Sequence, residues 1–174
     1  MKNRRGKSPR DHQQPANPAP LSNDHLLQQA ITNHEAGRLP EAGALYRQVL
    51  QASPNHVVAL HLLGVIAHQV GQHALALQLI DNAIQNDPQY DAAYNNRGIL
   101  LHALQQYTAA VDRYDKAIAL NPQLPEAHNN RGSTLHARLE YDAALESYDQ
   151  AILLRPDYAD AHANRGNALM ALKQ

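Results

Sequence analysis

The side chains with the most regular chemistry belong to an Asn-Arg-Gly triplet that recurs every 34 residues. The triplets occupy residues 96–98, 130–132 and 164–166. An amide offers the donor and acceptor groups that a peptide unit also offers, whereas a guanidinium shielded from water needs a carboxylate beside it. The recurrence therefore has two possible meanings. It marks the register of a structural repeat, or it presents a row of identical groups to a ligand.

The arginines of the triplets are interpreted as structural. Each has an aspartate sixteen residues before it, and the pairs are Asp81 with Arg97, Asp115 with Arg131, and Asp149 with Arg165. At the equivalent earlier place the arginine is replaced by Leu63, and the residue sixteen before it is Arg47. Because the aspartate occurs where the arginine occurs, we expect three ion pairs that join successive repeats.

The asparagines belong to a polar stripe that is the candidate ligand-contact surface. Its predicted members are Asn95, Asn96, Ile99, His102, Asn129, Asn130, Ser133, His136, Asn164 and Asn167. Amides at this spacing could hold the backbone of an extended peptide. The alternative is an ordinary solvated face, and duplication of one unit would also repeat it.

No set of residues in the sequence indicates catalysis. The eight glycines are isolated, there is no His-Glu-x-x-His motif, and cysteine is absent. Among the 11 histidines, His61 and His68 are seven residues apart, and His102 and His136 are 34 apart. Neither spacing places two imidazoles on one metal ion. We expect no enzymatic activity, no cofactor and no metal.

The elements that position these residues are predicted to be helices. In residues 91–104 one stripe carries Tyr94, Gly98 and Leu101, and residues 107–120 repeat such a stripe. Small residues at the places of Gly98 and Ala110 would let two antiparallel helices approach closely. Turn glycines and helix-ending prolines complete the pattern, namely Gly37, Gly71, Pro54, Pro88, Pro122 and Pro156. The units are 23–56, 57–90, 91–124, 125–158 and a partial 159–174.

This pattern resembles the tetratricopeptide repeat family over residues 23–174. The resemblance implies an all-α fold, a right-handed superhelical solenoid of antiparallel helix pairs, in which the first helices line a concave groove that binds proteins or peptides. The repeats are also similar to the region in front of the catalytic domain in bacterial relatives of the O-linked N-acetylglucosamine transferases. A substrate-recognition part of such a transferase is therefore the alternative function. A chaperone adaptor is a third class, but the acidic Asp24 and Glu35 would repel a carboxylate there.

Charge and composition limit the partners. Residues 1–20 contain five basic residues and one acidic residue, while the remainder contains 10 basic and 15 acidic residues. The acidic body argues against nucleic acid, and no apolar run is long enough to span a membrane. Carboxylates at Glu126 and Asp160, at the groove edge, suggest a neutral or basic peptide. The absence of cysteine fits a cytoplasmic location.

The two ends of the chain carry separate expectations. Residues 1–22 form a basic tail with four prolines, which predicts that it lacks fixed structure. The last unit ends after a single helix that still carries Leu169 and Met170. It is either a cap of the stack or the cut end of a longer protein, and the second interpretation is favoured because a cap should have a polar outer face.

Overall fold

The computed structural model describes residues 22–173, and within that range it contains nine α-helices and no strand. The helices are α1 (Asn23–Glu35), α2 (Leu39–Ala52), α3 (Val57–Gln69), α4 (His73–Asn86), α5 (Asp91–Ala103), α6 (Tyr107–Leu120), α7 (Pro125–Ala137), α8 (Tyr141–Leu154) and α9 (Ala159–Ala171). The predicted tail falls almost entirely outside the described residues. None of the described helices is both long enough and apolar enough to cross a membrane.

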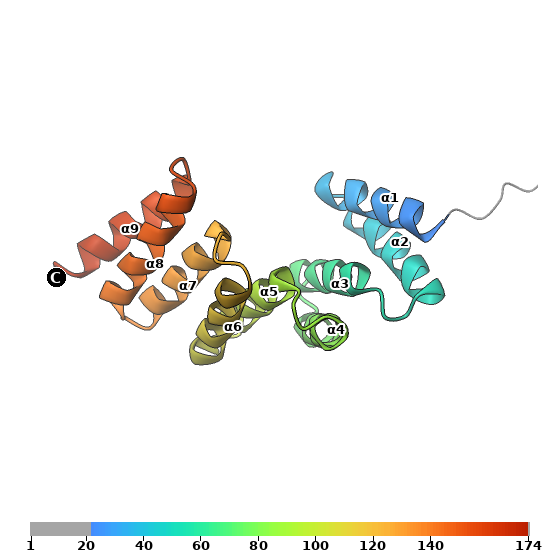
Figure 1. The fold of residues 1–174 in the computed structure, drawn as a ribbon, viewed down its shortest axis with the longest axis horizontal. Helices are drawn as coiled ribbons and strands as arrows, with labels where there is room; N and C mark the ends of the chain where they lie inside the picture. The colour runs from blue at the N-terminus through green and yellow to red at the C-terminus, as the bar shows by residue number, and fades with distance from the viewer. Residues whose placement is uncertain (1–21, 174) are drawn as a thin grey trace, which may run out of the picture.

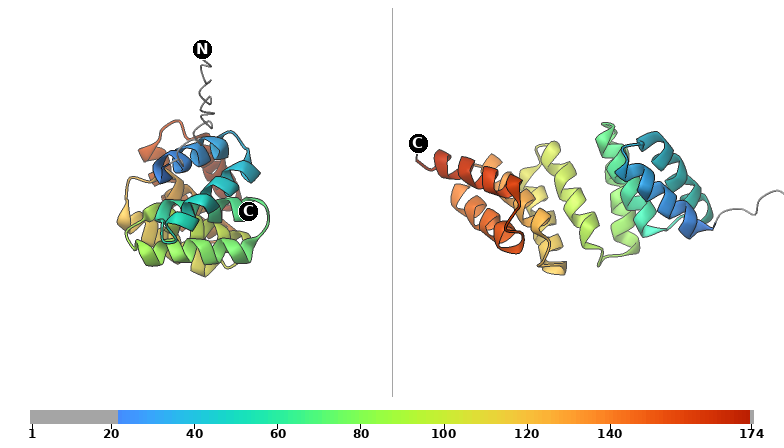
Figure 2. Two further views of the ribbon diagram at one scale, coloured as in Figure 1. Left: turned by 90° about the vertical axis from the view of Figure 1, so that its right-hand side faces the viewer. Right: turned by 90° about the horizontal axis from the view of Figure 1, so that it is seen from above.

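The helices form antiparallel pairs that stack into a solenoid along the long axis of the molecule (Figures 1 and 2). We call α1, α3, α5, α7 and α9 the first helices, and α2, α4, α6 and α8 the second helices. Each second helix packs against the first helix of its own pair and against the first helix of the next pair. Successive first helices also touch from α3 to α9. The all-α solenoid expected from the sequence is confirmed.

Close approach inside a pair depends on glycine in the first helix. A Cβ built on Gly98 would lie 2.5 Å from the ring of Tyr114, and one on Gly132 would lie 2.7 Å from the ring of Tyr148. Both tyrosines are 1% exposed, so the rings fill the space that the glycines leave. The equivalent Gly166 on α9 has nothing within 4 Å of such a Cβ.

The turn inside each pair needs one residue with a positive φ. Gly37 (φ 72°) and Gly71 (φ 79°) supply it in the first two pairs, as the sequence predicted. In the next two pairs the same place is taken by Gln105 (φ 59°) and Leu139 (φ 65°). The left-handed conformation of these two residues could not be predicted from the sequence, because neither residue type favours that region.

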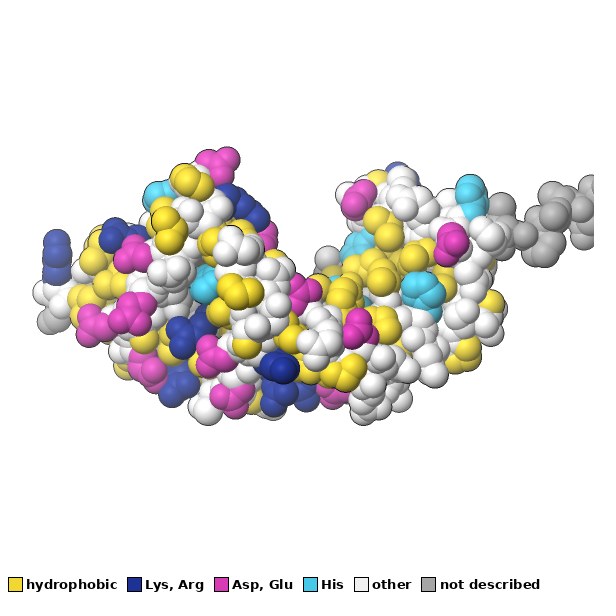
Figure 3. Space-filling view, in the orientation of Figure 1, with side chains coloured by type: hydrophobic (Ala, Val, Ile, Leu, Met, Phe, Trp, Pro, Cys, Tyr) yellow, Lys and Arg dark blue, Asp and Glu magenta, His cyan; other side chains and the backbone are white. Residues whose placement is uncertain are grey.

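The stack is curved, and its concave side appears as a hollow between the two halves of the molecule (Figure 3). α3 and α5 lie at the base of this hollow, while α1 and α7 lie on its two sides (Figure 1). The first helices therefore supply the surface that any ligand in the hollow would meet.

Candidate functional site

The three asparagines of the triplets lie on the first helices and are half-buried where successive repeats meet. Each amide reaches back to the first helix of the preceding pair. Asn130 Nδ2 donates to Asn95 Oδ1 at 3.2 Å, and Asn164 Nδ2 donates to Asn129 Oδ1 at 3.1 Å. The side chains thus form a ladder of hydrogen bonds between first helices.

The placement expected for Asn95 and Asn129 is wrong. Their side chains were expected to face the groove, but they are only 9% and 6% exposed and serve as acceptors in the ladder. The physical reason is that adjacent residues of a helix point about 100° apart, so only one of two neighbouring asparagines can lie on the open stripe. The buried member instead satisfies its polar group against the next repeat.

His61 takes the place of the buried asparagine at the first step of the ladder. Its Nε2 lies 2.6 Å from Asn96 Nδ2, and its Nδ1 lies 3.0 Å from Tyr90 Oη. Because an amide nitrogen only donates, Nε2 accepts and Nδ1 carries the hydrogen. Burial, with a smaller contribution from the charge of His34, lowers the pKa of His61 to about 4, so the ring is neutral near pH 7.

The role of His61 was missed at the sequence level, although a signal was present. His61 lies 34 residues before Asn95 and 68 before Asn129, so all three share one repeat position. Aligning the units by position rather than by residue type would have identified it.

Two small pockets lie on the first helices, one repeat apart. The first has a volume of about 130 Å³ and is lined by Ile99, His102, Tyr114, Asn130 and Ser133. The second has a volume of about 100 Å³ and is lined by Ser133, His136, Tyr148, Asn164 and Asn167. Each residue of the second set follows its counterpart by 34 residues, so the pockets are equivalent and share Ser133. We call them the groove pockets.

The groove pockets bring together seven of the ten predicted contact residues with the two core tyrosines. The other three are the buried Asn95 and Asn129, and Asn96, which lies at the preceding junction with His61. Within residues 22–173, the Oδ1 atoms of Asn96, Asn130 and Asn164 accept no hydrogen bond from the protein. Each amide therefore keeps an acceptor for another molecule. Asn96 and Asn130 also keep one N–H, whereas the second N–H of Asn164 donates to Ser133 Oγ at 3.4 Å. The volumes are smaller than that of a cavity known to hold benzene, about 150 Å³, and they suit a backbone amide or a small side chain.

His102 adds an acceptor to the first groove pocket. Its Nδ1 lies 2.8 Å from Thr134 Oγ1, and that hydroxyl donates to the carbonyl of Asn130 at 2.9 Å. Since the hydroxyl hydrogen is used, Nδ1–H of His102 is the donor and Nε2 keeps its lone pair. Burial lowers the pKa of His102, which favours this neutral form. The ring also packs edge-on against Tyr107, with centroids 5.3 Å apart.

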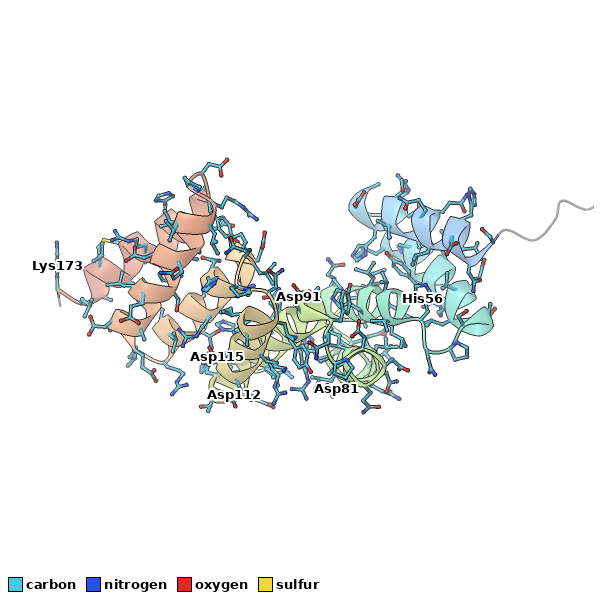
Figure 4. The ribbon with its side chains drawn as sticks, in the orientation of Figure 1. His56, Asp81, Asp91, Asp112, Asp115 and Lys173 are labelled. Carbon is cyan, nitrogen blue, oxygen red and sulfur yellow. The ribbon has the colours of Figure 1, made fainter. Side chains whose placement is uncertain are left out.

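The three Asp–Arg contacts are present across successive repeats. Arg Nε lies 2.5 Å from Oδ1 in the Asp81–Arg97 pair, 2.6 Å in Asp115–Arg131 and 2.5 Å in Asp149–Arg165. Asp81 and Asp115 project from second helices on the side away from the hollow (Figure 4). The carboxylates are 39% to 53% exposed, which makes the pairs surface contacts between repeats rather than buried charges.

The described residues show no arrangement typical of a metal centre. Within 22–173, no group of three or more His, Asp or Glu side chains lies close enough to hold an ion.

Comparison with known proteins identifies the repeat type. A tetratricopeptide repeat family model matches residues 34–96, and a second family model described as TPR repeat matches residues 100–138 and 132–173. No curated protein matches the chain.

Solved structures with the same architecture include several repeat proteins. A crystal structure of MamA is similar with a TM-score of 0.72 and 26% identity, over 83% of this chain and 84% of that one. PilF of Pseudomonas aeruginosa has a TM-score of 0.81 and 20% identity, over 87% and 69% of the two chains. The APC/C hetero-tetramer Cut9–Hcn1 has a TM-score of 0.81 and 17% identity, over 85% of this chain and 30% of that one. The last two similarities concern the fold alone.

Proposed function

Because this chain belongs to the tetratricopeptide repeat family, we propose that it is a protein-interaction module whose first helices bind an extended segment of a partner protein. The observation that carries the proposal is the pair of equivalent groove pockets, in which an asparagine and a histidine recur one repeat apart. A repeated site suits a repeated ligand, and the repeating unit of a polypeptide is its backbone amide.

The polar groups left over by the ladder match a peptide backbone. Asn130 offers one acceptor and one donor, the complement of a peptide N–H and C=O. Asn164 offers an acceptor, because both of its N–H groups donate within the protein. Nε2 of neutral His102 offers a further acceptor for an N–H. These contacts hold the backbone, and the side chains at Ile99, Ser133 and Asn167 then set the preference for neighbouring residues of the ligand.

The preferred charge of the partner is proposed to be neutral or basic, and the edge of the groove supports this in part. Asp160 is exposed at the start of α9. Glu126, the other carboxylate expected there, forms an ion pair with Arg155, so its charge is partly compensated. The electrostatic preference therefore depends mainly on Asp160.

The alternative function, substrate recognition for a glycosyltransferase, draws its support from the Asn row alone. The MamA, Cut9–Hcn1 and PilF structures to which the chain is similar are not named as glycosyltransferases. In that role the row would hold substrate backbones without reading their sequence, so scrambled versions of a bound peptide would bind alike. An interaction module for one partner would lose affinity on scrambling.

The test uses Ser133, because it lines both groove pockets. Ser133→Ile introduces the residue that the chain itself has at the equivalent position 99, so the helix should tolerate it. Filling the pockets should weaken binding of peptides selected from a random library on the full chain about tenfold, or about 1.4 kcal/mol. Thr108→Ile, at an exposed place on α6, is the matched control and should bind as the parent does.

Isothermal titration calorimetry measures the affinity, and circular dichroism checks that the helices remain. Equal affinity of Ser133→Ile and the parent would contradict binding in the groove pockets. Alanine at the three ladder asparagines is a less specific test, since it would also leave His61, Asn95 and Asn129 without their donors.

A further inference from the structure

A larger and mainly apolar pocket lies at the junction of the first two helix pairs, between α2, α3 and α4. It has a volume of about 200 Å³, and its walls include Gly43, Leu63, Ala67, Val70 and Leu75. We propose that this junction pocket is a second binding site, which takes a large apolar side chain of a partner protein that carries a carboxylate on the adjacent residue.

The junction pocket exists because two facing positions are truncated in this part of the repeat. Gly43 on α2 stands where later pairs have Leu77, Val111 and Leu145, and Ala67 on α3 stands where they have Leu101, Leu135 and Leu169. In the later repeats these facing positions pack together, as Leu77 does near Leu101 and Val111 does with Leu135. At the first junction these positions carry only a glycine and an alanine, and the space between them is open.

The size and the rim suit one large apolar group. A cavity of about 150 Å³ holds benzene, so the junction pocket has room for the ring of phenylalanine or the side chain of leucine. Val70 is 53% exposed and Leu75 is 42% exposed, which is unusual for apolar side chains that line a hollow. Covering them with an apolar group would remove this surface from water.

Arg47 supplies the charge preference. It lines the junction pocket, and its Nη1 would lie 3.6 Å from a Cβ placed on Gly43, so the guanidinium lies over the truncated position. At the later junctions the equivalent residue is an aspartate that is paired with the arginine of the triplet. At the first junction Arg47 replaces the aspartate and Leu63 replaces the arginine. Arg47 has no carboxylate within salt-bridge distance among residues 22–173. A ligand carboxylate is its natural partner.

This site is separate from the groove pockets. The α3 residues of the junction pocket lie on the face of α3 that packs against second helices. The groove pockets are formed by other helices, namely α5, α6, α7, α8 and α9. Loss of one site would therefore leave the other intact, and the two proposals can fail independently.

The experiment compares two small peptides on the isotope-labelled full chain by NMR. The probes are acetyl-Glu-Phe-amide and acetyl-Lys-Phe-amide, which share the ring and differ in charge. The acidic probe should shift the amide signals of residues that line the junction pocket, with a dissociation constant on the order of 1 mM for a ligand of this size. It should bind about threefold more tightly than the basic probe at low salt, and the difference should fall as salt is added.

Three variants make the test specific. Gly43→Leu and Ala67→Leu each fill the junction pocket with the residue that other repeats have there, and both should abolish the shifts while the chain stays folded. Arg47→Gln should retain the ring contact and remove the difference between the two probes. Binding that survives both filling variants, or an acidic preference that survives Arg47→Gln, would overturn the proposal, as would no shift of these signals by either probe.

Discussion

At the scale of single residues, His61 shows how one repeat position can do the same structural task with different chemistry. Asn95 and Asn129 accept a ladder hydrogen bond through an amide, which does not titrate. His61 accepts the same bond through Nε2, which is possible only while the ring is neutral. The first step of the ladder therefore depends on pH, and the later steps do not.

We predict that His61→Asn makes the stability of the protein less sensitive to acid. The folded pKa of His61 is about 4, below the usual value of 6.5, so the unfolded chain binds the extra proton first. The stabilisation that comes from keeping His61 neutral is complete above about pH 6.5 and is lost as the pH falls towards 4, by a few kcal/mol at most. His68 and His102, whose pKa values burial also lowers, act in the same direction.

Urea unfolding at several pH values between 7 and 4 measures this effect. The parent should lose more free energy of unfolding over that interval than His61→Asn, since asparagine preserves an acceptor at the same repeat position. His25→Asn, at an exposed place on α1, is the matched control and should follow the parent. Parallel pH profiles for the parent and His61→Asn would refute a titrating ladder.

Which of two neighbouring asparagines faces the open side could be only partly predicted. The 34-residue period placed Asn96, Asn130 and Asn164 on one stripe, and the structure puts them half-buried between first helices. The same period also carried Asn95 and Asn129, which are buried. Repetition alone cannot separate these two sets, because both repeat equally well and only the packing of the next helix distinguishes them.

At the scale of the elements, the glycine that α5, α7 and α9 share at one repeat position has a different environment in α9. Gly98 and Gly132 each face a tyrosine ring of the second helix, whereas Gly166 on α9 faces open space. The residue is the same in all three places, so its effect on stability should depend only on whether a second helix covers it.

We predict opposite signs for alanine at two of these glycines. Gly132→Ala brings a methyl group to within 2.7 Å of the Tyr148 ring, and the repacking should cost about 1–3 kcal/mol, only partly offset by better helix propensity. Gly166→Ala meets no atom and should stabilise the helix by up to about 1 kcal/mol. Chemical unfolding monitored by circular dichroism gives both values. A loss at Gly166→Ala as large as that at Gly132→Ala would show that the α9 face is covered in solution.

The Asp115–Arg131 pair gives a prediction about the joints between helix pairs. Arg131 binds Asp115 on α6 through Nε, and its Nη1 donates to Ser147 on α8 at 2.8 Å, so it connects three helices. Because the side chains are 28% and 51% exposed, we expect a coupling of about 0.5–1 kcal/mol rather than that of a buried pair.

A double-mutant cycle on Asp115→Ala and Arg131→Ala measures this coupling. Removing both residues should cost less than the sum of the single changes, and added salt should reduce the difference. The Arg138–Glu140 pair, which lies beside a turn and joins no repeats, serves as the comparison and should show less coupling. Zero coupling between Asp115 and Arg131 would mean that their recurrence is only inherited from duplication.

At the scale of the whole molecule, the architecture could be predicted from the sequence, because the repeats carry similar residues at equivalent positions. Prolines at a fixed interval, and small residues in phase with them, specified helix pairs that must stack. The junction pocket was not foreseen, since Gly43 and Ala67 are ordinary small residues when read one unit at a time. The junction pocket forms because these two small residues face each other across two repeats, where the later junctions have larger side chains.

The two groove pockets also give the molecule a direction. Their walls change along the stack, from Ile99 with Ser133 near α5 to Ser133 with Asn167 near α9. The first pocket is more favourable for an apolar side chain, because Ile99 forms part of its wall. The second pocket is more favourable for a polar side chain, because Ser133 and Asn167 can form hydrogen bonds with it. A ligand long enough to occupy both would consequently be oriented by the order of its side chains, although its backbone amides look alike in either sense. The difference between the two pockets, rather than their repetition, would therefore determine in which direction the ligand chain runs along the groove.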